Sequence, residues 1–239
     1  MDNFEQFTGP VLCVAAHPED IEIHAGGTVA RLVRAGIALS YVLCTSGNRG
    51  TADLTATMAG VGARRENEQR QAAAVLGVDN ITFLRHDDGD LQYVARDLRA
   101  EIVRLIRQKR PRTIITHDPF PGDGSHDSCA IYPDHLAVGT VTFEAAFVCA
   151  PGPLFYPEQL QAGLSPHKPE HLYFIMSQSP DTFVDISQVW ARKIDAVHVY
   201  KSQGRHLPEV EPFFRHIAGE LGAKVRVDLA EGFRRLAPS

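Results

Sequence analysis

The sequence predicts an α/β fold: a Rossmann-like three-layer sandwich with a mostly parallel sheet and a smaller C-terminal region of strands and helices. Apolar runs at 11–16, 37–45 and 80–84 have the length of buried strands, and a segment with helical features follows each of them. Parallel strands that are joined by helices need this spacing. The glycine pattern GxGxxG is missing, so the sequence lacks a dinucleotide-binding fingerprint.

The helices are predicted from apolar spacing and from signals at their ends. Gly36 and Gly77 follow two of them, because glycine readily adopts the left-handed backbone at a helix C-terminus. Pro111 ends a third helix, because proline disrupts the helical hydrogen-bond pattern. The elements expected in this part of the chain are helices at 25–35, 60–76, 93–109 and 136–149, and a fourth strand at 113–116.

The composition shifts after Ala150, where Pro151 and Pro153 open a proline-rich stretch. We therefore expect a Rossmann-like core over 1–150 and a C-terminal extension over 151–239, packed together as a single structural domain. The elements expected in the extension are strands at 172–176 and 182–186, a helix at 188–203 and a further strand within 225–236.

Charge and hydropathy exclude several classes of protein. The 239 residues carry a formal net charge of −5 and no cluster of basic residues, so no nucleic-acid partner is expected. No run approaches the roughly 20 apolar residues that a membrane-spanning helix requires. The opening MDNFEQFTGP lacks the apolar core of a signal peptide, so we expect a cytoplasmic protein.

The first strand ends abruptly in His17, Pro18, Glu19 and Asp20. These residues should lie at the carboxyl edge of the sheet, where open α/β sheets bind their ligands. An imidazole and a carboxylate three residues apart can converge on a divalent cation such as zinc. Alternatively, the acidic residues complement the positive end of a helix. The residues alone leave both interpretations open.

Segments spread over almost the whole chain resemble the LmbE/PIG-L family of zinc-dependent de-N-acetylases. The likeness begins with AHPEDIEIHAGGTVARL (16–32), which is similar to the family's AHPDD segment. The other matching segments are TSGNRGT (45–51), RRENEQRQAAAVLGV (64–78), FLRHDDGDL (83–91), THDPF (116–120), YPDHLAVG (132–139), VDIS (184–187) and KIDAVHVYKSQ (193–203). The resemblance implies a hydrolase that removes an acetyl or other acyl group from an N-acetylated amino sugar or a related amide.

The resemblance also assigns a metal centre and catalytic groups. His17, Asp20 and His135 match the family's ligands for Zn²⁺, although another divalent metal can use the same donors. Three protein ligands with one open position are typical of a catalytic zinc site. Glu19 then serves as the base that activates water, and Asp134 orients its neighbours.

Four further residues are substrate-binding candidates, three of them by the same resemblance. Arg65 matches an arginine near the substrate, and its guanidinium suits sugar hydroxyls, but it also fits a solvated helix face paired with Glu68. Asp88 matches a substrate-side aspartate, although Asp-Gly is also ordinary turn chemistry. Asp118 in THDPF completes the residues that match. His126 is a further candidate that the resemblance does not assign; it lies six residues before Tyr132, and its imidazole could substitute for the family histidine that Tyr132 replaces.

The chain departs from the family pattern at three positions. Glu19 stands where the family has aspartate, and His24 stands where it often has glycine. Tyr132 replaces a histidine that stabilises the transition state or protonates the leaving amine; a tyrosine hydroxyl can donate to an oxyanion but is a poor acid near neutral pH. Tyr132 therefore favours an alternative, a catalytically altered or inactive member of the same fold that binds sugar or metal. A plain Rossmann-like nucleotide binder is a third reading.

The partner expected from the resemblance is a small N-acetyl amino sugar or one of its conjugates. A homo-oligomer, either a trimer or a hexamer, is also expected. Specificity should lie in the loops at 46–60, 117–134 and 151–171, because binding loops vary on a shared scaffold.

Overall fold

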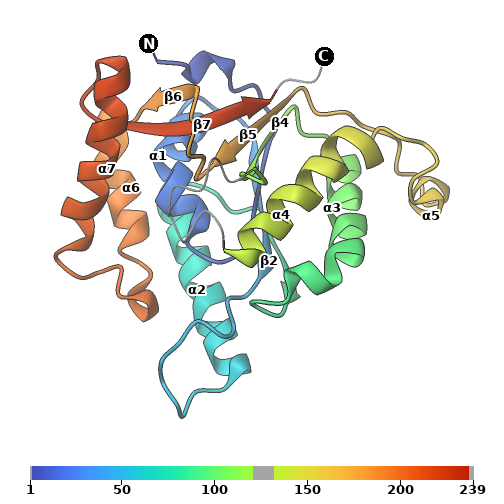
Figure 1. Ribbon diagram of the computed structural model, residues 1–239, viewed down its shortest axis with the longest axis horizontal. Coiled ribbons are helices and arrows are strands. Elements are labelled where there is room, and N and C mark those ends of the chain that lie inside the picture. Colours follow the sequence, from blue (N-terminus) through green and yellow to red (C-terminus); the bar gives the residue numbers. More distant parts are fainter. Residues whose placement is uncertain (1, 121–131, 237–239) are drawn as a thin grey trace.

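A seven-stranded sheet in the order β3-β2-β1-β4-β5-β7-β6 runs through the computed structural model, which describes residues 2–120 and 132–236 (Figure 1). β1 to β5 pair in parallel, and β7 pairs antiparallel with both β5 and β6. This arrangement confirms the predicted α/β class with a mostly parallel sheet. The strands are β1 (Val11–Ala15), β2 (Leu39–Thr45), β3 (Ile81–His86), β4 (Thr113–His117), β5 (His171–Ile175), β6 (Thr182–Asp185) and β7 (Ala230–Leu236).

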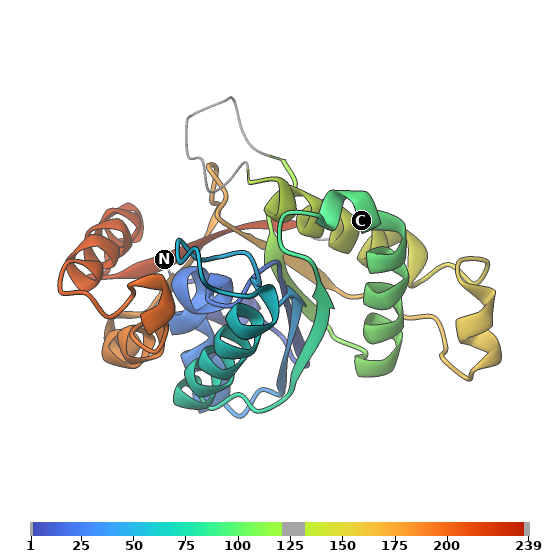
Figure 2. The same cartoon turned by 90° about the horizontal axis from the view of Figure 1, so that it is seen from below.

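Helices cover both faces of the sheet (Figure 2). One face carries α1, α2, α6 and α7, and the other carries α3 and α4. A short helix, α5, lies in an arm that extends from the α3–α4 side (Figure 1). The helices are α1 (Asp20–Arg34), α2 (Met58–Leu76), α3 (Ala95–Lys109), α4 (Pro133–Glu144), α5 (Pro157–Gln161), α6 (Trp190–Val197) and α7 (Val210–Val225).

β1 is buried on both faces, as its unbroken apolar run predicts. Val11 and Cys13 pack into the core under α1 and α2, whereas Leu12 and Val14 pack into the core under α3 and α4. Because alternate side chains of a strand point to opposite faces, one apolar strand serves two hydrophobic cores. β1 therefore fixes the position of His17, which lies two residues beyond its end.

Several element boundaries differ from the sequence-based predictions. α1 begins at Asp20 rather than at 25, because the backbone turns sharply at Glu19, which has φ 90°. The helix expected at 188–203 is shorter, since α6 ends at Val197 and a separate 3-10 turn covers Lys201–Gln203. α5 and α7 were not predicted; the Pro-rich arm and the glycines of α7 (Gly219 and Gly222) obscure their helical spacing.

A buried carboxylate on β7 fastens α1 to the C-terminal strands. Glu231 accepts hydrogen bonds from the backbone N–H groups of Gly27 (2.8 Å) and Thr28 (2.7 Å) and from Nζ of Lys193 (2.6 Å). A Cβ atom at Gly27 would lie 2.5 Å from Ile186, so only glycine allows this approach. The C-terminal strands thus belong to the same sheet as β1, whereas a boundary at residue 150 stays a prediction.

None of the helices within the described residues combines the length and the apolar character needed to cross a membrane.

Candidate active site

The polar residues predicted at the end of the first strand lie where the strand order reverses. The chain passes from β1 to β2 on one side of the sheet and from β4 to β5 on the other, so a crevice opens beyond the carboxyl ends of β1 and β4. His17 follows β1, and His117 is the last residue of β4. α1 and α4 begin at the same edge and supply Asp20 and His135.

The three predicted metal ligands converge on one point. Nδ1 of His17 lies 3.2 Å from Nε2 of His135, and the two nitrogens lie 3.5 and 3.6 Å from Oδ2 of Asp20. All three residues are buried, and their donor atoms fall within 4.8 Å of one another. Two imidazole nitrogens and one carboxylate oxygen are a typical donor set for catalytic zinc.

Two further carboxylates hold the opposite nitrogen of His17. Its Nε2 lies 3.2 Å from Oδ2 of Asp134 and 3.1 Å from Oδ1 of Asp88. A carboxylate in this position accepts the Nε2 proton, which leaves the lone pair on Nδ1 directed at the candidate metal position. Asp134 is fully buried and also accepts hydrogen bonds from the N–H groups of Gly89 and Leu91, so its orientation is fixed by the chain after β3.

The charges around this point fit a divalent cation. Among the described residues that line the cavity or contact His17, four carboxylates (Glu19, Asp20, Asp88 and Asp134) face two guanidiniums (Arg65 and Arg205). Four negative and two positive charges leave a surplus of two negative charges when the imidazoles are neutral. A bound dication would balance that surplus, as buried charges require.

The same surplus affects the ionisation of the ligands themselves. Burial alone would lower the pKa of His17, but the neighbouring carboxylates of Asp134, Asp20 and Asp88 raise it well above its usual value. Burial likewise opposes ionisation of Asp20, yet the imidazoles around it hold its pKa well below the usual range. The chain alone therefore attracts positive charge to this position.

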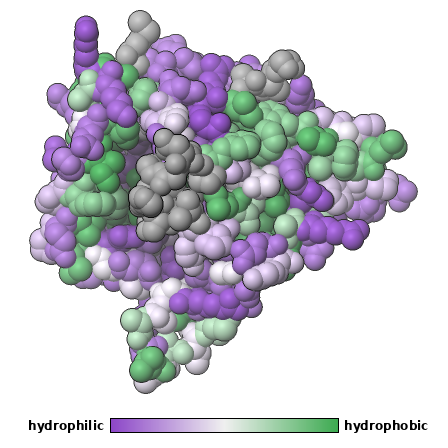
Figure 3. All heavy atoms as spheres, viewed as in Figure 1, coloured by the Kyte–Doolittle hydropathy of each residue, from purple (hydrophilic) through white to green (hydrophobic). Residues whose placement is uncertain are grey.

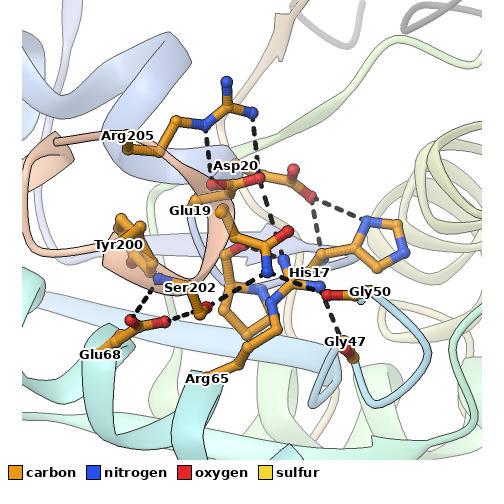
Figure 4. A network of polar contacts seen from close by, with 12 residues as sticks. His17, Glu19, Asp20, Gly47, Gly50, Arg65, Glu68, Tyr200, Ser202 and Arg205 are labelled. Carbon is orange, nitrogen blue, oxygen red and sulfur yellow. Dashed lines mark hydrogen bonds and ion pairs between the residues drawn. The ribbon is translucent and has the colours of Figure 1, made fainter. Parts of the chain in front are cut away.

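Glu19 is held beside the metal position by a strained backbone and by two arginines (Figure 4). Its φ of 90° is unusual for a residue other than glycine, and such strain is often kept at functional sites. Both carboxylate oxygens accept hydrogen bonds from Arg205, at 3.0 Å from Nε and 3.2 Å from Nη2. Nη2 of Arg65 lies 3.9 Å from the same carboxylate.

Arg65 connects the loop after β1 with the loop after β2. Its guanidinium donates to the carbonyl oxygens of Gly47 (3.1 Å) and Pro18 (3.0 Å) (Figure 4). A Cβ atom at Gly47 would lie 2.2 Å from Nη1 of Arg65, and one at Gly50 would lie 2.3 Å from it. The glycines of the TSGNRGT segment thus make room for a buried arginine rather than for a ligand phosphate.

Of the remaining predicted site residues, some line the cavity and others do not. Tyr132, at the start of α4, lines the cavity with its ring centroid 5.5 Å from that of His17. Asp88 also lines the cavity. Asp118 does not; its carboxylate is bound by Arg234 of β7 and accepts from the N–H of Phe120, so we leave it out of the substrate contacts. His126 lies outside the described residues.

Two residues near the centre were missed by sequence reasoning. The ring of His117 stacks on that of His135, with centroids 4.2 Å apart, and its Nε2 lies 3.2 Å from Oδ2 of Asp20. Its position at the end of a predicted strand was a usable signal. Arg205 follows a 3-10 turn in the C-terminal region, and no local pattern marked it.

The turn that carries Arg205 is tied down by α2. Glu68 accepts hydrogen bonds from the N–H and hydroxyl of Ser202, and Gln203 donates to the carbonyl of Gly50 (Figure 4). These contacts give Ser202 and Gln203 a structural role, and Gln203 lines the cavity as well. Glu68 supports the loop rather than pairing with Arg65.

Comparison with known proteins places this arrangement among sugar deacetylases. Residues 12–146 match the protein family described as PIG-L, GlcNAc-PI de-N-acetylase. The diacetylchitobiose deacetylase of Thermococcus kodakarensis is 37% identical over 230 residues, which cover 94% of this chain and 82% of that protein. A 1D-myo-inositol 2-acetamido-2-deoxy-alpha-D-glucopyranoside deacetylase of Mycobacteroides abscessus is 32% identical over 161 residues, covering 58% of this chain and 55% of that protein.

A solved structure is similar along most of the chain. N,N'-diacetylchitobiose deacetylase from Pyrococcus horikoshii, complexed with its inhibitor MPG, superposes with a TM-score of 0.86 at 30% identity, covering 95% of this chain and 83% of that chain.

Proposed function

The chain belongs to the PIG-L family of GlcNAc-PI de-N-acetylases, and we propose that it is a metal-dependent hydrolase that removes the acetyl group from an N-acetylated amino sugar. The observation that carries this proposal is the convergence of His17, Asp20 and His135 beside the carboxylate of Glu19. The sugar deacetylases among its relatives support the same reaction.

Zn²⁺ is the metal we propose for this site, held by His17, Asp20 and His135. Two nitrogen donors and one oxygen donor favour zinc over magnesium or calcium, which prefer oxygen donors. When bound, such an ion lowers the pKa of water to about 7 and polarises the carbonyl of the amide. Asp134 and Asp88 keep His17 in the tautomer that offers Nδ1.

Glu19 is the proposed general base. It takes a proton from the attacking water as the water oxygen bonds to the acyl carbon. The C–N bond then breaks, and Glu19 returns the proton to the amine nitrogen, so that amide and water give acetate and a free amine. Arg205 holds both oxygens of Glu19, which limits the rotation of the carboxylate during this transfer.

Tyr132 is the proposed hydrogen-bond donor to the carbonyl oxygen, on which negative charge develops during attack. It stands at the start of α4 next to both imidazole ligands, with its ring centroid 5.3 Å from that of His135. Because a phenol stabilises an oxyanion without giving up its proton, this role needs only a hydrogen bond. Proton return to the amine then falls to Glu19.

The proposed substrate class is a small N-acetyl amino sugar or a conjugate of one. A cavity of about 350 Å³ opens over the metal position, and Arg65, Asp88 and Gln203 line it with groups that suit sugar hydroxyls. The homo-oligomeric state and the cytoplasmic location stay predictions.

The test is metal content and amine release, measured for the wild type and for His135→Ala. We expect near-stoichiometric zinc and release of amine from N-acetylglucosamine or N,N'-diacetylchitobiose by the wild type. His135→Ala should lose both, because only two ligands remain.

His216→Ala is the matched control, because His216 lies on the solvent side of α7 with its side chain 75% exposed. This variant should keep zinc and activity. Wild-type protein that binds zinc but cleaves no amide would favour the inactive sugar-binding or metal-binding alternative, and full activity in His135→Ala would contradict the proposed metal centre.

A further inference from the structure

A second cavity, of about 260 Å³, lies next to the active-site cavity. One of its walls is formed by α7, which contributes Phe214, Ile217, Ala218 and Leu221. The other walls come from the first turn of α1, the connection between β5 and β6, α6 and β7. Figure 3 shows hydrophobic residues over α7, at the left edge of the molecule.

The two cavities share part of their lining. Ile23, His24 and Met176 border both of them. Met176 directly follows β5 and has a φ of 59°, a conformation that costs free energy for a residue with a side chain. This backbone carries the flexible methionine side chain between the two cavities, where it can adjust to a ligand.

The charged groups at the second cavity are already paired. Nζ of Lys193 donates to Glu231 (2.6 Å) and to the carbonyl oxygen of Ile23 (2.7 Å). Glu231 also accepts from the backbone of Gly27 and from the backbone and hydroxyl of Thr28. Both charged residues are buried, so a ligand gains little by contacting them, and the α7 wall decides which ligand fits.

The shared imidazole is uncharged near neutral pH. Burial lowers the pKa of His24 to about 3; the negative charge of Asp20 opposes this shift, and the positive charge of Lys193 adds to it. A neutral ring between two cavities offers a flat surface over which an apolar group can pass. His24, which the sequence analysis left without a role, thus forms part of the surface between the two cavities.

We propose that this cavity binds an apolar substituent of the substrate, an alkyl chain or an aromatic ring attached to the amino sugar. The proposal rests on the proposed function, because the sugar must sit over Glu19 for its substituent to pass Met176. The substituent can be joined through the acyl group or through the glycosidic oxygen, and the experiment separates these two sources.

The first measurement is calorimetric binding of methyl and octyl β-glucosaminides, which carry no acetyl group and need no turnover. Each methylene that enters the cavity should tighten binding about fourfold. We call the ratio of the Kd of the methyl glucosaminide to that of the octyl glucosaminide the octyl advantage. Ala218→Phe fills the cavity and should reduce this ratio to about one. Glu220→Phe adds the same ring on the solvent side of α7, where the side chain is 68% exposed, and should keep the advantage.

Ile217→Asp is the second wall variant, because Ile217 is 39% exposed and a charge there is compatible with folding. It should also remove the octyl advantage. The second series compares kcat/KM for N-acetylglucosamine and N-octanoylglucosamine, which tests attachment through the acyl group.

An advantage of the apolar substituent in either series, lost in both wall variants and kept in Glu220→Phe, would support the proposal and identify the source. No advantage in either series, or an advantage that survives in both wall variants, would overturn it. Failure to cleave any amide would contradict the proposed function alone, because glucosaminide binding does not depend on turnover.

Discussion

Two groups of buried polar residues each include part of α1. We call Gly27, Thr28, Lys193 and Glu231 the closed cluster, and His17, Asp20, Asp88, Asp134 and His135 the open cluster. In the closed cluster, Glu231 receives four hydrogen bonds and faces one ammonium group. In the open cluster, the donor nitrogens of His17 and His135 point at each other, 3.2 Å apart.

The comparison shows that buried charge does not by itself identify a functional site. Both clusters are buried, and both join segments far apart in the sequence. The closed cluster satisfies its charges internally, and its role is to fasten α1 to β7 and α6. The open cluster keeps a surplus of negative charge and converging lone pairs, and only a further cation completes it. The convergence of two imidazoles and a carboxylate, together with this surplus of negative charge, distinguishes the candidate active site.

The largest expected effect comes from Glu19, the proposed general base beside the open cluster. Glu19→Gln should lower kcat by about 10²–10⁴-fold, because the amide cannot accept the water proton. Zinc content should stay near the wild-type value, since Glu19 is not a ligand. Steady-state kinetics and elemental analysis of the same preparation check both statements, and wild-type activity in this variant would exclude Glu19 as the base.

A substitution in the closed cluster should lower the free energy of unfolding rather than the catalytic rate. Glu231→Ala leaves Lys193 buried without its carboxylate, and breaking a buried pair in this way costs about 3–5 kcal/mol. Denaturant unfolding measures the loss. Glu220→Ala, on the exposed side of α7, should change the unfolding free energy by less than about 0.5 kcal/mol. Comparable losses in the two variants would contradict the role given to Glu231.

A smaller effect should follow from the carboxylates that orient His17. Asp134→Asn preserves the shape of the side chain but removes the negative charge that faces Nε2 of His17, and zinc affinity should fall about 10–100-fold. Competition with a chelator of known affinity measures this change. Asp97→Asn, on the exposed surface of α3, serves as the control and should bind zinc as the wild type does. Unchanged zinc affinity in Asp134→Asn would show that the charge of Asp134 does not support metal binding.

The smallest effect is expected at Glu66, whose arginine partners are exposed. Burial would raise the pKa of Glu66, but hydrogen bonds from Arg85, Ser46 and Arg70 outweigh it and lower the pKa to about 2. A carboxyl whose pKa is lowered on folding stabilises the protein above its unfolded pKa, and this stability is lost as the pH falls toward the folded pKa.

Glu66→Gln should therefore be less stable than the wild type at neutral pH, by about 1 kcal/mol because solvent screens the pairs. The difference should shrink as the pH falls from about 4.5 to about 2. Unfolding curves at several pH values test this, and a difference that stays constant with pH would show that charge is not involved.

Local patterns in the sequence determined most of the fold and much of the candidate site. The apolar run before His17, the helix start at His135 and the order of the elements are set by residues close together in the chain, because strand and helix periodicity is a local property. These patterns also placed His17 and Asp20 at the carboxyl edge of the sheet, where the structure finds them.

Only the tertiary structure decided which distant side chains meet. Arg205 binds Glu19 across 186 positions of sequence. Asp118, a predicted substrate-binding residue, pairs with Arg234 of β7 and is not among the described residues that line the cavity. The second cavity depends on α7, which the sequence patterns did not predict. Such contacts depend on how the helices and strands pack in space, and charge or size in the sequence does not specify which of many distant partners each side chain will meet.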